Sequence, residues 1–213
     1  MIGLLALVAC AGPAPCVDEL HLYADELPTE LVSVCAGTDD MGIELECPDD
    51  TPVVVAGAGI DATILQVDSS ESDGTRAQAF VLSGCTLELR DLTISGGYVE
   101  QYVDCADGGG SCDGWAGGAF SLDDSTVTLT RVAVRENTAD RGGAGALRDS
   151  RVVLVDAEVA DNRGGGFVLD GESELESVGT SWGSNGDDDV ILDGSDFDAG
   201  GRTDFVCADS ACE

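Results

Sequence analysis

The feature that most constrains the fold of this chain is a segment of thirteen residues that recurs along it. STVTLTRVAVREN occupies residues 125–137, SRVVLVDAEVADN occupies residues 150–162 and SELESVGTSWGSN occupies residues 173–185. These copies begin 25 and 23 residues apart, and CTLELRDLTISGG at residues 85–97 fits the same frame with Gly97 in place of the last asparagine. A period of roughly 20 to 50 residues is typical of proteins in which similar units stack and share one core.

The same positions stay apolar when the copies are aligned and extended upstream. Within each copy these positions alternate with polar ones, which is the pattern of β-strands that bury one face. The expected inward columns are Phe80, Phe120, Gly145 and Phe167; Leu82, Leu122, Leu147 and Leu169; Leu87, Val127, Val152 and Leu175; Leu89, Leu129, Leu154 and Ser177; Leu92, Val132, Ala157 and Thr180; and Ile94, Val134, Val159 and Trp182.

No copy can bury its apolar face alone, so we expect one copy per coil, with like residues stacked about 4.8 Å apart. The prediction is an all-β fold, a single-stranded right-handed parallel β-helix (solenoid) of about six coils with N- and C-terminal caps. Each coil would hold 23–25 residues. The right-handed sense follows from the rule for parallel crossovers. Leucine-rich and ankyrin arrays require helical segments, for which the pattern offers no candidate.

The corners of the coils are expected at recurring polar and glycine positions. Asn137, Asn162 and Asn185 fall in one column, where asparagine tolerates left-handed backbone and can stack into an amide ladder. Asp91, Arg131 and Asp156 fall in one outward column, which favours ion pairing between neighbouring coils. A further corner carries the glycine pairs Gly117-Gly118, Gly142-Gly143 and Gly164-Gly165. We interpret the asparagine and glycine columns as structural.

The N-terminus opens with an apolar run of nine residues, which is too short to span a bilayer and suits a secretory signal peptide. Leu7-Val8-Ala9-Cys10 resembles the lipobox of bacterial lipoproteins. The resemblance implies cleavage before Cys10 and lipid modification of that residue, and plain secretion is the alternative. The expected organisation is a lipoprotein-type signal peptide (1–9), a tether (10–16), an N-terminal cap with first strands (17–50), a β-helix (51–195) with an insertion loop (98–116), and a C-terminal disulfide-closed cap (196–213).

Eight cysteines remain when Cys10 is set aside, and an even number in an exported chain indicates disulfides. The sequence does not choose among the possible pairings, although Cys105 with Cys112 and Cys207 with Cys212 are near enough to close small loops. A metal site built on cysteine is disfavoured, because no CxxC pair occurs and the only histidine is His21.

The charge of the chain limits its partners. Nine arginines and no lysine stand against 42 acidic residues, for a net charge of −33. Such a surface repels nucleic acid and anionic lipid, so we expect no nucleic-acid partner and membrane contact through a lipid anchor only. The 43% hydrophobic content in strand alternation argues that this acidic chain is nevertheless a packed domain.

Two sequence motifs resemble known families. Gly117-Gly118-Ala119-Phe120 followed by Val134-Arg135-Glu136-Asn137 resembles the polymorphic outer-membrane protein repeat, which prefers GGAI and FxxN. VVVAGAGIDATIL at residues 53–65 is similar to the first coil of pectate-lyase-like right-handed β-helices. Together the resemblances cover about residues 50–195. They imply a β-helix fold and an exported life at the outer membrane or cell surface, commonly as an adhesin.

We therefore predict a noncatalytic surface protein that acts as a structural, adhesive or recognition rod for a protein or glycan partner. The insertion loop carries the candidate binding residues Tyr98, Tyr102 and Trp115, because loops on a rigid scaffold often carry function. The alternative is a calcium-dependent polysaccharide lyase-like or polysaccharide-binding protein, but no compact motif singles out a catalytic residue. No cofactor is expected apart from calcium, for which Asp187, Asp188 and Asp189 are weak candidate ligands.

Overall fold

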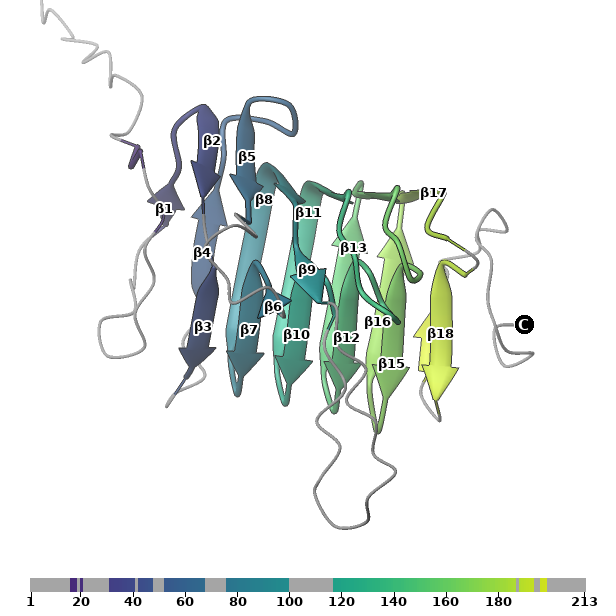
Figure 1. The fold of residues 1–213 in the computed structure, drawn as a ribbon. Helices are drawn as coiled ribbons and strands as arrows, with labels where there is room; N and C mark the ends of the chain where they lie inside the picture. Colours follow the sequence, from purple (N-terminus) through teal and green to yellow (C-terminus); the bar gives the residue numbers. More distant parts are fainter. Residues whose placement is uncertain are drawn as a thin grey trace, which may run out of the picture.

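The computed structural model describes the chain at residues 16–18, 20, 31–40, 42–47, 52–67, 76–99, 117–186, 188–193 and 196–198. Every regular element in these residues is a β-strand. Successive strands advance along the molecule in sequence order, from purple to yellow in Figure 1. The prediction of an all-β fold is confirmed for this part of the chain.

One sheet has six parallel strands, which lie side by side across the lower half of Figure 1. Each strand comes from a different copy of the repeat or from the segments before and after the copies. In spatial order the strands are β3 (Ile43–Glu46), β7 (Phe80–Ser83), β10 (Phe120–Asp123), β12 (Gly145–Arg148), β15 (Phe167–Asp170) and β18 (Val190–Asp193).

The other large sheet has eleven parallel strands in two rows. The first row is β1 (Val32–Ser33), β4 (Val53–Ala56), the first halves of β8 (Thr86–Ser95) and β11 (Thr126–Arg135), β13 (Arg151–Val155), β16 (Glu174–Val178) and β19 (Asp196–Asp198). The second row is β2 (Gly37–Asp40), β5 (Thr63–Gln66), the second halves of β8 and β11, β14 (Glu158–Ala160) and β17 (Ser181–Gly183). A separate antiparallel pair joins β6 (Arg76–Ala77) to β9 (Tyr98–Val99).

The division into two rows results from one bend in each copy. Asp91 in β8 and Arg131 in β11 have φ of 54° and 51°, in the left-handed region. Asp156 and Gly179, with φ of 50° and 66°, occupy the same place between β13 and β14 and between β16 and β17. Left-handed backbone reverses the local curvature of a strand, so the first and second halves of each copy pair in different rows.

The strand registers confirm the inward columns that the repeat predicts. Phe120 is the partner of both Phe80 and Gly145, and Leu129 is the partner of both Leu89 and Leu154. The apolar side chains of these columns form one buried cluster along the stack, against which the partly buried Trp182 packs. Parallel strands in stacked sheets, one set for each copy, are compatible with the predicted β-helix.

The last copy departs from the columns in two compensating positions. Ser177 stands where Leu89, Leu129 and Leu154 stand, and the larger Trp182 stands in the column of Val159. The indole Nε1 of Trp182 donates a hydrogen bond to Ser177 Oγ at 3.2 Å, and its ring meets Phe167 edge-on. The bulky indole therefore fills the space that the small serine leaves, and the serine satisfies its donor.

Gly145 is required by the phenylalanines that stack around it. A Cβ at Gly145 would lie 2.7 Å from the Phe167 ring and 3.2 Å from the Phe120 Cβ. We expect Gly145→Ala to lower the free energy of unfolding by about 1–3 kcal/mol, because the core has no room for the added methyl group. Chemical denaturation measures this. The control is Gly183→Ala in β17, where a Cβ would meet nothing within 4 Å; equal losses in both variants would contradict the packing argument.

Thr180 is an unsatisfied polar group in an apolar column. Its side chain is fully buried, and its hydroxyl has no hydrogen-bond partner among the residues that the structure describes. We expect Thr180→Val to raise the free energy of unfolding by about 1–2 kcal/mol, because the substitution keeps the shape and removes the desolvation cost. The control is Thr93→Val, since the buried Thr93 hydroxyl donates to the Ile60 carbonyl. That variant should lose stability, and a gain in both would contradict the argument.

Two disulfides cross the N-terminal part of the chain, Cys16–Cys35 and Cys47–Cys85. They confirm the expectation of disulfides for these four cysteines and indicate an extracellular or periplasmic protein. The segment expected as N-terminal cap and first strands, residues 17–50, supplies β1, β2 and β3, which pair with β4, β5 and β7. The candidate disulfide residues Cys105, Cys112, Cys207 and Cys212 lie outside the described residues.

Candidate functional site

The asparagine column forms a buried hydrogen-bond ladder beneath one corner of the stack. The Nδ2 group of Asn137 donates to Asn162 Oδ1 at 3.0 Å, and Asn162 Nδ2 donates to Asn185 Oδ1 at 2.9 Å. Each asparagine is at most 2% exposed. The predicted amide ladder is confirmed.

The ladder has a direction and ends on a carboxylate. At one end Gly97 N donates to Asn137 Oδ1, and at the other Asn185 Nδ2 donates to Asp189 Oδ1 at 2.7 Å. Because every amide donates toward the same end, the bonds polarise one another. Asp189 was a weak candidate for calcium, but the structure buries its carboxylate to 7% exposure as the terminal acceptor of this ladder.

The left-handed residue at this corner is the one before each asparagine, which differs from expectation. Glu136, Asp161 and Ser184 have φ of 60°, 57° and 57°, whereas the asparagines are not in the left-handed region. The preceding residue turns the chain, so the asparagine side chain can point inward and stack. In the first copy Gly96, with φ of 78°, takes this role.

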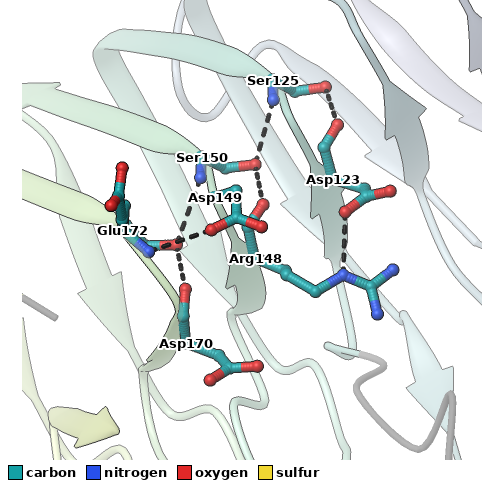
Figure 2. Close-up of polar contacts among 8 residues, drawn as sticks. Asp123, Ser125, Arg148, Asp149, Ser150, Asp170 and Glu172 are labelled. Atoms are coloured by element: carbon teal, nitrogen blue, oxygen red, sulfur yellow. Dashed lines mark hydrogen bonds and ion pairs between the residues drawn. The ribbon is translucent and has the colours of Figure 1, made fainter. Parts of the chain in front are cut away.

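A second ladder, of serines, was not anticipated from the sequence (Figure 2). The backbone N–H of Ser125 donates to Ser150 Oγ at 3.0 Å, and that of Ser150 donates to Ser173 Oγ at 3.2 Å. Each hydroxyl in turn donates to the carbonyl two or three residues before it, as Ser150 does to Arg148 O. The available sequence feature was that each copy begins with serine, or with Cys85 in the first. The hydroxyl groups of these serines therefore form hydrogen bonds within the stack.

Most of the arginines in the described residues form ion pairs with carboxylates on the outer faces of the sheets. Arg148 pairs with Asp123 across β10 and β12 at 2.8 Å, as Figure 2 shows. Further pairs are Arg90 with Glu88, Arg131 with Asp91, Arg135 with Asp61, and Arg151 with Glu174 and Glu176. Such exposed pairs contribute little stability each, and they distribute cations over an acidic surface.

The expected ion pair in the outward column, between Arg131 and Asp91, makes the stability of the protein depend on pH. Arg131 donates to Asp91 from Nε at 2.6 Å and Nη2 at 2.7 Å, and these hydrogen bonds lower the pKa of Asp91 from its ordinary value. A carboxyl with a lowered folded-state pKa adds stability above its unfolded pKa and loses it as pH falls through the lowered value. We therefore expect the stability difference between wild type and Arg131→Gln to shrink from neutral pH to about pH 2. Urea titrations across this range test it, and a constant difference would contradict it.

The corner outside the asparagine ladder gathers several residues singled out from the sequence. Tyr98, Thr138 and Arg163 are successive partners in isolated parallel bridges, so they form one column across three copies. Tyr98, half-buried in β9, is where the insertion loop begins. Tyr102 and Trp115, the other candidate binding residues, lie outside the described residues. We call this corner, defined by Tyr98, Thr138 and Arg163, the loop corner.

An open pocket of about 470 Å³ lies at the loop corner, around Arg163. Its walls come from three successive copies, and Asp188 of the acidic run lies in one of them. The lining residues are Ala139, Asp140, Arg163, Gly164, Gly165, Gly186, Asp188 and Ile191.

The glycines of the pocket are needed for its shape. Gly164 and Gly165 have φ of 89° and 97°, and a Cβ at Gly164 would clash with the Ala139 carbonyl oxygen. The absence of side chains brings backbone to the pocket surface. From the sequence these glycines were expected to be purely structural, and no pocket was anticipated beside them.

The pocket holds hydrogen-bonding groups without partners in the described part of the chain. The backbone N–H groups of Gly164 and Gly165 donate to no described residue. Arg163 forms no ion pair with the residues that the structure describes, in contrast to the paired arginines above. Unmet donors in a concave site are free to bind a ligand's acceptors.

The described residues offer no cluster of metal-binding side chains. No group of three or more His, Cys, Asp or Glu side chains there is placed to hold a metal ion. Asp187 and Cys10 lie outside the described residues. The same part of the chain contains no helix long and apolar enough to cross a membrane. No protein-family model, curated protein or solved structure matches the chain.

Proposed function

We propose that this chain is a noncatalytic, exported recognition rod that binds a cell-surface partner through the loop corner. The rod is a right-handed parallel β-helix of about six coils. It is anchored to the outer membrane through lipid on Cys10, and the pocket at the loop corner contacts the partner. The observation that carries the proposal is the pocket at the loop corner, with unmatched donors beside the root of the insertion.

The surroundings of the pocket support binding in preference to catalysis. The buried asparagines and serines donate and accept within ladders, so their polar groups serve the stack. The pocket residues Arg163 and Gly186 directly follow Asn162 and Asn185, so the asparagine ladder holds the backbone beside the pocket in place. A rigid scaffold lowers the entropy cost of binding, because little has to be ordered when the partner arrives.

The resemblance to the polymorphic outer-membrane protein repeat is part of the proposal. It accounts for the spacing of the GGA corner and the asparagine, and it agrees with an oxidising compartment, which the two disulfides indicate. The lyase-like alternative rests on the pectate-lyase-like segment at residues 53–65. This segment forms β4, the turn after it and β5, which pair with β8 and lie outside the pocket lining.

The test is a binding screen of the full chain in its oxidised form. The chain would be applied to a glycan array, to anionic polysaccharides and to whole cells, with and without calcium, while ultraviolet absorbance detects unsaturated product. We expect saturable binding without product. Calcium-dependent product would overturn the noncatalytic proposal in favour of a lyase, and the absence of binding to every glycan and to whole cells would reject the recognition role.

A further inference from the structure

We infer that the pocket around Arg163 binds an uncharged sugar unit of a glycan chain. This inference rests on the proposed recognition function and names the class of ligand. It depends on the residues that line the pocket, on the signs of their charges, and on the donors there that have no partner among the described residues.

The donors of the pocket converge on one part of its surface. The position that a Cβ of Gly186 would take lies 3.3 Å from Gly165 N and 3.4 Å from Gly164 N. The two backbone nitrogens therefore lie close together beside Gly186, and a side chain on Gly186 would lie against both of them. The exposed Arg163 guanidinium extends from the residue before this pair and adds further donors.

The acceptors come from the copies on either side. Asp140 precedes Arg163 by one copy and Asp188 follows it by one, and both line the pocket. Neither carboxylate forms an ion pair with Arg163, so the guanidinium and the carboxylates of the pocket do not satisfy one another. A ligand that satisfies them must itself both donate and accept hydrogen bonds, as hydroxyl groups do.

The charge balance disfavours an anionic ligand, and the mixed lining favours an uncharged one. Two carboxylates and one guanidinium line the pocket, and the whole chain carries a net charge of −33, so an anionic ligand is repelled. A cation would face Arg163 and the two backbone N–H groups. Ala139 and Ile191 add apolar surface against which the C–H face of a sugar ring can pack. The opening to solvent lets a glycan chain continue beyond the bound unit.

The size of the pocket is appropriate for such a unit. A volume of about 470 Å³ lies within the range of small-ligand sites, roughly 300–1,000 Å³. An open pocket with few apolar contacts gives weak affinity for a single site, about millimolar. Higher affinity for a cell surface would come from several rods in one membrane binding one glycan layer.

The test titrates the full oxidised chain with uncharged oligosaccharides (cellotetraose, mannotetraose and N-acetylchitotetraose), with tetragalacturonate as the anionic probe and glycine as a zwitterion. Nuclear magnetic resonance or calorimetry measures Kd for wild type, Arg163→Gln, Asp188→Asn and Gly186→Ala. Arg135→Gln is the matched control, because Arg135 pairs with Asp61 and does not line the pocket. Thermal melts verify that each variant is folded.

We expect at least one uncharged oligosaccharide to bind, with Kd rising about tenfold in Arg163→Gln and Asp188→Asn, since each loses a charged hydrogen bond. Gly186→Ala should weaken binding similarly by covering the two N–H groups, and Arg135→Gln should change Kd less than about twofold. Tighter binding of tetragalacturonate or glycine than of every uncharged sugar would overturn the inference. Glycan binding that is unchanged in all three pocket variants would overturn it while leaving the recognition function intact. A wild-type chain that binds no glycan and no cell surface would reject both.

Discussion

Leu129→Asp is expected to unfold the protein. Leu129 is fully buried at the centre of β11, between Leu89 and Leu154 of the neighbouring strands. An aspartate there would place an unpaired charge in the shared core, where no described group lies ready to neutralise it. We expect a loss of more than about 4 kcal/mol, a large fraction of the stability of a typical domain. Leu154→Asp should have the same effect.

Circular dichroism and chemical denaturation of purified Leu129→Asp provide the measurement. The matched control is Thr130→Asp, one residue further along β11, where the side chain faces outward and pairs in register with Arg90. This control should fold and keep its stability within about 0.5 kcal/mol. If Leu129→Asp melts like the wild type, the inward columns are wrong.

Asn162→Leu is expected to cost more than about 3 kcal/mol, because one side chain serves several buried partners. Its Nδ2 donates to Val134 O and Asn185 Oδ1, both at 2.9 Å. Its Oδ1 accepts from the N and Nδ2 atoms of Asn137, at 3.1 Å and 3.0 Å. Leucine keeps similar bulk and leaves these groups buried without partners. Asn162→Asp should also destabilise, since it retains the acceptor but loses the donor and adds a buried charge.

The neighbouring Asp161 supplies the control for the ladder. It is exposed and has a φ of 57°, which asparagine accepts readily, so Asp161→Asn should be neutral within about 0.5 kcal/mol. Urea denaturation of the three variants measures the difference. Equal stability of Asn162→Leu and Asp161→Asn would mean that the amide ladder contributes nothing beyond packing.

The inward columns could be predicted because strand alternation and a repeat period together leave one consistent register. Moving a strand by one residue would turn every apolar side chain to the solvent, so Phe80, Phe120 and Phe167 could be aligned from their positions in the repeat alone. The asparagine ladder followed for the same reason, since Asn137, Asn162 and Asn185 recur at one position of the copy.

The disulfide pairings could not be predicted from the repeat. Spacing along the chain favoured pairs of nearby cysteines such as Cys105 with Cys112, which lie outside the described residues. In the described part Cys47 pairs with Cys85, 38 residues away, because stacking brings the end of β3 beside the start of β8. Distance in the chain is a poor guide when each copy lies against the next.

The candidate site could also be predicted only in part. Tyr98 could be selected as the root of an insertion, and Asp188 as part of an acidic run, but nothing in the sequence relates them to Arg163. The structure places Arg163 in one column with Tyr98 and in one pocket with Asp188.

The sequence by itself determined which side chains are buried and which copies are neighbours, because burial follows a local period that every copy repeats. Only the tertiary structure decided which residue at each corner is left-handed, which serines form a ladder and whether Arg163 has an ion-pair partner among the described residues. Those properties depend on where three successive copies place their backbone and side chains relative to one another, and no single copy contains that information.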